Sequence, residues 1–205
     1  MAALVTDQQL ADTLIAQRRA TGADRWDEVW EGLYVMAPLP NDEHQQLVSR
    51  LTSILEDVIG WKGLGEVRPG VNISDRRDDW TQNYRCPDVA VFLRGTSAEN
   101  RGTHWFGGPD LAIEIVSPQD RVHEKIPFYA QVGTRELLVV KRDPWELNLY
   151  ELCDQELRLA GTSTLNSTHG PLVSRVVPWS LQLVPAEPRP RIRIVTQVDA
   201  KSWDV

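Results

Sequence analysis

Hydrophobic positions recur at helical spacing in one long stretch of the chain. Between residues 41 and 60, apolar side chains return every three or four positions, as they do on one face of a helix. The residues of this stripe are Leu47, Leu51, Leu55 and Val58. Asn41 or Asp42 is expected to cap this helix. A second helix is predicted near the N-terminus, with Thr6 as its N-cap and Gly22 just past its end.

Shorter apolar runs predict strands. Residues 26–38 are rich in β-branched and aromatic residues, which indicates two short strands joined by a turn at Glu31-Gly32. The runs at 88–93 and 110–116 are apolar throughout and predict buried strands. The other expected strands are 65–74, 135–141, 145–152, 156–161 and 172–177, with loops at 75–87 and 95–109.

A helix is expected directly after the strand at 110–116. Ser117 has the chemistry of an N-cap, and Pro118 suits the first helical position. Pro127 is expected to break or restart this helix, because a proline inside a helix costs about 3 kcal/mol. Gly133 is expected to end it.

This order of elements predicts an α/β fold with a central mixed β-sheet flanked by few helices. The length of 205 residues suggests one domain. We expect an N-terminal helix over residues 1–25 and a core over 26–152. Residues 153–205 are expected to add strands and a proline-rich tail that pack on the same domain.

Composition changes this picture in two ways. The net charge is −7, so the protein as a whole does not attract nucleic acid, and any surface for it must be a local basic patch. The two cysteines, Cys86 and Cys153, lack the spacing of a zinc site. No signal peptide and no run of about 18 apolar residues is present, so we predict a cytoplasmic protein with two reduced thiols.

Two acids lie in strongly apolar surroundings and are the first candidates for chemistry. Asp88 opens the strand at 88–93, and Glu114 lies inside "LAIEIV". Acids are rarely buried unless they are paired or bind a metal. If the two strands are neighbours, both carboxylates and the backbone carbonyl of Ile115 suit Mg²⁺ or Mn²⁺. Lys125 would then assist an attacking water or stabilise charge on a phosphoryl group.

Structural roles remain open for each of these residues. Asp88 could cap the strand end or bind Arg85, and Glu114 could face outward on a half-exposed edge strand. Lys125 could be an ordinary solvated lysine. Asp110 also follows a proline, but it lies on the same strand as Glu114 at a separation of about 13 Å, which is too far for one shared ion.

Further residues are candidates with weaker signals. His44 lies on the apolar stripe at the helix start, where it could pack locally or point into a site. Glu28 and Glu31 lie on opposite phases of a strand, so only one can point inward. The arginines and tryptophans of the loops could meet phosphates or stack on bases, or could make ordinary loop contacts. These are Arg76, Arg77, Arg85, Trp80 and Trp105.

Several motifs together resemble the Uma2 family (DUF820), a group of endonucleases assigned to the PD-(D/E)XK superfamily. They are "WDEVWEGLYVMAPLPNDEHQQLV", "NYRCPDVAVFL" and "PDLAIEIVSPQDR", followed by "EKIPFYAQVGTRELLVV". The resemblance covers about residues 26–151. It implies a restriction-endonuclease-like core, Mg²⁺ and hydrolysis of phosphodiester bonds in nucleic acid, which we take to be DNA. Because members of the family often pair, it also implies a homodimer.

The resemblance assigns roles to individual residues. The aspartate of the "PD" motif falls on Asp88 and the strand acid on Glu114. Val116 stands where the superfamily usually has its lysine, and Lys125 matches a lysine moved to the following helix. The family's glutamate and histidine match Glu28 and His44, with Glu31-Gly32 in place of Asp-Gly. We therefore expect a metal-dependent endonuclease; the rival hypotheses are a degenerate module that binds nucleic acid or a protein partner, and a metal-dependent hydrolase of another substrate.

Overall fold

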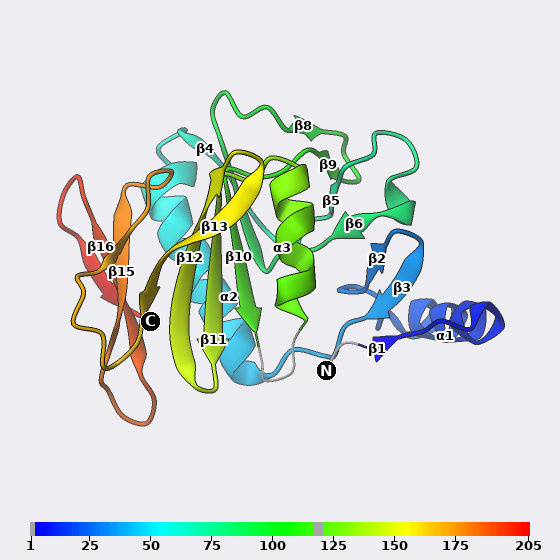
Figure 1. The fold of residues 1–205 in the computed structure, drawn as a ribbon, viewed down its shortest axis with the longest axis horizontal. Helices are drawn as coiled ribbons and strands as arrows, with labels where there is room; N and C mark the ends of the chain where they lie inside the picture. Colours follow the sequence, from blue (N-terminus) through cyan, green and yellow to red (C-terminus); the bar gives the residue numbers. More distant parts are fainter. Residues whose placement is uncertain (1–2, 117–120) are drawn as a thin grey trace.

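The computed structural model describes residues 3–116 and 121–205. Its centre is a six-stranded mixed sheet in the order β13-β12-β11-β10-β7-β4. Helix α2 covers one face of this sheet and helix α3 covers the other (Figure 1). Only β10 and β11 pair in parallel, and every other pair in the sheet is antiparallel. The strands are β4 (Gly65–Pro69), β7 (Val89–Leu93), β10 (Leu111–Val116), β11 (Glu136–Arg142), β12 (Trp145–Cys153) and β13 (Glu156–Ser163).

Strand β10 is buried on both faces, because helices cover both sides of the sheet. Leu111, Ile113 and Ile115 pack on the side of α2. Their neighbours Ala112 and Val116 pack on the side of α3. Glu114 shares the phase of this second set, so its side chain lies between the sheet and α3. The carboxylate is therefore inside the molecule and not on a half-exposed edge strand.

Helix α2 (Asp42–Leu55) confirms the long amphipathic stretch. Asn41 caps it, since its side chain accepts a hydrogen bond from the His44 N–H at 2.9 Å. The helix continues as a π-helical turn, η1 (Glu56–Gly60). The expected stripe is buried. Its burial fixes the rotation of the helix and so directs the first turn toward the sheet.

Helix α3 (Val122–Gln131) runs through Pro127 without a break, which corrects the sequence prediction. Pro127 removes one helical hydrogen bond, but Phe128 and Tyr129 directly after it are buried against the sheet. Their packing holds the helix together. The expected cap at Ser117-Pro118 lies outside the described residues, and the described helix has Arg121 at its N-cap position.

None of the helices in residues 3–116 and 121–205 is long and apolar enough to cross a membrane. The first of them, α1 (Gln8–Thr21), begins one residue later than expected. Asp7 and not Thr6 is its N-cap, because the Asp7 carboxylate accepts from the Leu10 N–H at 2.9 Å. Gly22 ends the helix in a left-handed conformation, as predicted.

An outer sheet of short strands lies beside the α3 face. The predicted hairpin is present, and its turn residues Glu31 and Gly32 have φ of 47° and 82°, as a two-residue hairpin turn requires. The single strand expected at 65–74 is instead β4 and β5, in different sheets, because the chain turns at Gly70 with φ of 61°. The expected loops contain the short helix η2 (Trp80–Gln82) and three short strands. The outer strands are β1 (Ala3–Leu4), β2 (Glu28–Trp30), β3 (Leu33–Met36), β5 (Ile73–Ser74), β6 (Tyr84–Arg85), β8 (Glu99–Asn100) and β9 (Trp105–Phe106).

The C-terminal part forms a third sheet in the order β14-β15-β16-β17. The stretch expected to be a proline-rich tail contains two of its strands, β16 and β17. Ile192, Ile194 and Thr196 alternate inward along one of them. This sheet shares its buried core with α2 and the central sheet. The strands are β14 (Leu172–Val173), β15 (Trp179–Val184), β16 (Arg191–Thr196) and β17 (Ser202–Asp204).

Candidate active site

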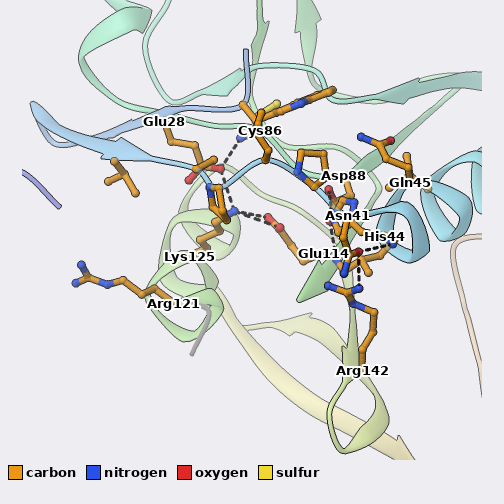
Figure 2. Close-up of a pocket in the computed structure, with 18 of the residues that line it drawn as sticks. Glu28, Asn41, His44, Gln45, Cys86, Asp88, Glu114, Arg121, Lys125 and Arg142 are labelled. Carbon is orange, nitrogen blue, oxygen red and sulfur yellow. Dashed lines mark hydrogen bonds and ion pairs between the residues drawn. The ribbon is translucent and has the colours of Figure 1, made fainter. Parts of the chain in front are cut away.

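One cavity of about 250 Å³ is lined by six of the residues that the sequence singled out: Glu28, His44, Asp88, Glu114, Ile115 and Lys125. Asp88 and Glu114 reach it from neighbouring strands, because β7 pairs with β10 and Val89 lies opposite Ile113. Lys125 reaches it from α3, and His44 reaches it from the first turn of α2 (Figure 2). Four separate stretches of the chain thus contribute side chains to a single cavity.

Asp88 is held in place by two donors. It precedes β7, and its Oδ2 accepts a hydrogen bond from the Ile115 N–H at 2.6 Å. Its Oδ1 lies 3.0 Å from Nε2 of His44. The side chain keeps 20% of its surface exposed, so the carboxylate is fixed at the strand and still open to the cavity.

Glu114 is deeply buried in the cavity, with 6% of its side chain exposed. It accepts hydrogen bonds from Lys125 Nζ at 3.1 and 3.2 Å and from the Tyr129 hydroxyl at 2.5 Å. Burial raises the pKa of Glu114. The charge of Lys125 opposes this rise in pKa, while the nearby negative charges of Asp88 and Glu28 add to it.

Lys125 joins two acids from different sheets. Its Nζ lies 2.9 Å from Oε1 of Glu28 and 3.1 Å from Oε1 of Glu114. Figure 2 shows the ammonium group pointing between these carboxylates. Pro127 does not prevent this reach, because α3 continues through it. The structure therefore places Lys125 beside the strand acid, eleven residues after it in sequence.

Of the two glutamates on the N-terminal hairpin, only Glu28 enters the cavity. Its Oε1 accepts from the Cys86 N–H at 2.9 Å, and its Oε2 accepts from the Trp30 indole at 2.6 Å. Glu31 lies on the exposed turn, where it binds Arg76 at 3.0 Å and Asn83 at 2.6 Å. The alternation of side chains along the strand accounts for this difference.

His44 points into the cavity and not along its own helix. Apart from the contact of Nε2 with Asp88, its Nδ1 is buried without a hydrogen-bond partner among the described residues. The Asn41 cap fixes the first turn of α2 and so the direction of the ring. This geometry fits a site residue better than a local capping histidine.

The structure contradicts the expectation that Arg85 contacts nucleic acid. Its side chain is 5% exposed and lies between the rings of Trp30 and Phe128. One guanidinium nitrogen donates to the Val29 carbonyl at 3.0 Å. Arg85 is thus a buried structural residue that contacts both the hairpin and α3.

The other loop residues predicted to meet nucleic acid lie outside the cavity. Trp105 is buried against Phe92 and has no face available for a base. Trp80 stacks on His104. Arg76 and Arg77 are partly exposed, and both form ion pairs with nearby glutamates. Their role toward nucleic acid stays a prediction.

Asp110, the alternative acid, has a structural environment. It accepts a hydrogen bond from Arg135 at 3.0 Å and one from the Leu93 N–H at 2.7 Å. It does not line the cavity. These contacts tie the start of β10 to β7 and to β11.

Sequence reasoning missed the cavity residues Arg121 and Arg142, and also Tyr129, which binds Glu114 without lining the cavity. Tyr129 follows Lys125 by four positions, so helical spacing places both residues on the same face of α3. This spacing could have been used to predict Tyr129. Arg142 lies at the end of β11 and donates to Asn41 at 2.9 Å and to Glu43 at 3.1 Å. No local pattern marks Arg142 or Arg121, which the fold alone brings to the cavity.

The donor chemistry of the cavity fits a divalent cation in part. The described residues contain no cluster of three or more histidine, cysteine or acidic side chains arranged around one point. Mg²⁺, however, usually binds through one or two carboxylates and completes its shell with water and substrate phosphate. Asp88 and Glu114 line the cavity together with Ile115, and they supply two carboxylates of this kind. Lys125 contacts two carboxylates, those of Glu28 and Glu114.

Comparisons with known proteins agree with this geometry. A family model described as "Uma2: Putative restriction endonuclease" matches residues 16–186. A solved structure described as "a putative nuclease belonging to DUF820", from Anabaena variabilis, is 21% identical and covers 65% of this chain and 75% of that chain, with a TM-score of 0.53. This likeness shows a shared fold, and no curated protein matches the chain. The description of the family supports a nuclease. Because the family model spans most of the sequence, the chain belongs to the Uma2 family.

Proposed function

We propose that this protein is a metal-dependent endonuclease that hydrolyses phosphodiester bonds of DNA. The observation that carries the proposal is the convergence of Asp88, Glu114 and Lys125 in one cavity. Membership of the Uma2 family supports the same reaction class. Two fixed acids and a lysine are the groups that a phosphodiester reaction needs.

Asp88, Glu114 and the Ile115 carbonyl would hold Mg²⁺ or Mn²⁺. When bound, such an ion supplies positive charge to a phosphate oxygen and lowers the pKa of water. The chain prepares this arrangement, because the Ile115 N–H and His44 already orient the Asp88 carboxylate. Glu114 is oriented by Tyr129.

Lys125 would stabilise negative charge that develops on the phosphoryl group, or orient the attacking water. Its ammonium group is fixed from two sides by Glu28 and Glu114. A hydrogen-bond donor that is already in position before the substrate binds does not have to reorganise during the reaction. Such preorganised groups therefore contribute strongly to the rate. Glu28 acts here through Lys125, as a positioning residue.

Cleavage of plasmid and linear DNA with Mg²⁺ or Mn²⁺ tests the proposal. We expect Asp88→Asn and Lys125→Met each to lower kcat by about 10²-fold or more, because each removes a group that acts on the transition state. Glu31→Gln is the matched control, since Glu31 is exposed and lies outside the cavity. The proposal fails if the wild-type protein cuts no DNA, or if Asp88→Asn cuts as fast as wild type.

One observation favours a second candidate, a nuclease-fold module that binds nucleic acid or a protein partner without catalysis. The site carboxylates already have cationic or donor partners in Lys125, His44 and Tyr129. Calorimetric titration with Mn²⁺ separates the two candidates. An active site binds the ion in wild type and loses it in Asp88→Asn, whereas a degenerate module shows no binding in either.

A further inference from the structure

The acidic centre lies at the bottom of a cavity and not on an open surface. Glu28 and Glu114 expose 5% and 6% of their side chains, and Lys125 exposes 13%. The cavity, at about 250 Å³, is slightly smaller than most ligand pockets, which begin at about 300 Å³. A phosphodiester must enter it to meet the two acids. One flexible nucleotide unit can do so more readily than the stiff backbone of a duplex, which keeps its course over about 150 base pairs.

Of the arginines predicted to meet nucleic acid, none is both exposed and without an ion-pair partner among the described residues. Tight duplex binding depends on several lysine or arginine contacts to phosphates. Here Arg85 is buried, and Arg76 and Arg77 are already in ion pairs with glutamates. The chain as a whole carries a net charge of −7. The cationic side chains that line the cavity itself are Lys125, Arg121 and Arg142 (Figure 2).

One wall of the cavity is apolar and suits a base. It is formed by the segment between β3 and α2, by residues of both elements, and by Trp26, which precedes β2. Leu39 on this segment is 79% exposed, so its side chain is accessible to a ligand. Trp26 lines the same cavity and packs over Gly70, where a Cβ atom would overlap its ring. Apolar and aromatic surfaces next to cations are how proteins hold unpaired bases. The wall consists of Trp26, Val35, Pro38, Leu39, Pro40 and Val48.

We propose that the cavity accepts an unpaired nucleotide, so that the substrate is single-stranded DNA or an unpaired segment within a duplex. This inference rests on the proposed nuclease function. The phosphate lies at the acidic floor next to Lys125, and the base lies against the wall that contains Trp26 and Leu39. Leu39 and Trp26 are then specificity-determining residues, because they contact the base of the substrate.

Binding tests this proposal independently of cleavage. The probes are a fluorescent single-stranded 20-mer and the same strand in a blunt duplex, titrated with the wild-type chain without metal and followed by anisotropy. We expect the single strand to bind about tenfold more tightly or better, because each stacked base contributes about 1–3 kcal/mol. Equal or tighter binding of the duplex overturns the proposal.

Two matched pairs of variants locate the effect. Leu39→Ser is expected to weaken single-strand binding several-fold, while Leu159→Ser, also an exposed leucine but outside the cavity, leaves it unchanged. Trp26→Ala is compared with Trp61→Ala in the same way; Trp61 is 76% exposed and outside the cavity. If both leucine variants bind like wild type, the wall does not hold a base and the proposal is wrong.

Cleavage then separates this proposal from the nuclease function. With Mg²⁺ or Mn²⁺, we expect cuts in the single strand and in a duplex only within an unpaired loop, and Leu39→Ser should raise KM more than it lowers kcat. A duplex that is cut at least as fast as the single strand refutes the unpaired substrate but leaves the nuclease intact. If neither is cut while the single strand still binds more tightly, the nuclease function fails and the preference stands.

Discussion

At the scale of single residues, Asp27 has a role distinct from that of its neighbour Glu28. Its carboxylate is 2% exposed and receives Arg18 from α1 in a two-point contact at 2.5 and 2.6 Å. It also accepts from the Tyr34 hydroxyl, and from the Ala37 N–H at 2.7 Å. Alternation along the strand sends Asp27 toward α1 and Glu28 toward the cavity. Asp27 thereby anchors the segment that leads to the cavity wall.

Substitution of Arg18 tests this anchor. Arg18→Ala leaves the Asp27 carboxylate buried without its cation, and we expect the free energy of unfolding to fall by about 3 kcal/mol. Arg19→Ala is the matched control, because Arg19 exposes 73% of its side chain and its ion-pair distance is 4.0 Å. Its effect should stay below about 0.5 kcal/mol. Urea titrations of the two variants measure the difference, and equal midpoints would contradict a structural role for Asp27.

At the scale of elements, Glu136 connects β11 of the central sheet to the segment after β14. It is 1% exposed and accepts from the Ser174 hydroxyl and, at 2.6 Å, from the Arg175 N–H. Burial raises the pKa of Glu136 above its ordinary value of 4.5, although both donors lower it. Desolvation therefore exceeds the stabilisation of the charged form by these hydrogen bonds.

This raised pKa makes part of the stability depend on pH. Because the folded state holds the Glu136 proton more tightly than the unfolded state does, this residue stabilises the fold most in acid. Its contribution falls as pH rises from about 4.5 through the folded-state pKa. Between pH 4.5 and pH 7, the free energy of unfolding of wild type should fall because of Glu136. In Glu136→Gln, which cannot titrate at this position, we expect a smaller fall. Urea titrations at both pH values measure this, and identical pH dependence in the two proteins would show that Glu136 does not titrate in this range.

The sequence predicted long elements better than short ones. Helix α2 and strand β10 have periodic apolar patterns over many residues, so their positions and buried faces could be predicted. Strands such as β5, β6 and β9 have two residues each and exist because a distant strand pairs with them. A local sequence pattern could not predict that α3 continues through Pro127. The helix continues because the residues after Pro127 are buried against the sheet.

The same distinction holds for the site. The proximity of Asp88 and Glu114 could be predicted, because an acid in an apolar strand is conspicuous and the two strands are neighbours. Their roles, and that of Lys125, stay predictions. The burial of Arg85 could not be predicted, since it depends on rings from two other elements. Arg142 could not be predicted either, because it reaches the cavity only through the order of strands in the sheet.

At the scale of the whole molecule, the cavity lies where the central sheet, α2, α3 and the N-terminal hairpin meet. Glu28 belongs to the outer sheet and Glu114 to the central sheet, and Lys125 on α3 contacts both. A ligand that binds these acids would therefore stabilise the arrangement of three structural units. This makes thermal stability a readout of the site that does not require catalysis.

Metal addition tests this coupling. Since a ligand of the folded state stabilises it by RT ln(1 + [L]/Kd), Mn²⁺ at about 100 times its Kd should add about 2.7 kcal/mol and raise Tm by several degrees. Chelation with EDTA should reverse the rise. Asp88→Asn should show no rise, whereas Asp110→Asn serves as a control because Asp110 lies outside the cavity. An equal rise in wild type and Asp88→Asn would place the metal elsewhere.

The pairing of Ile113 with Val89 has a consequence for how this family tolerates change in length. Side chains alternate along a strand, so one inserted residue between Asp110 and Glu114 would turn the glutamate toward α2 and away from Lys125. The sheet would still form, but the cavity would lose this acid. An insertion near the positive-φ Gly95 or Gly102, between the two strands, would leave that alignment unchanged. Natural variation in length should therefore concentrate in that connection and avoid the strand.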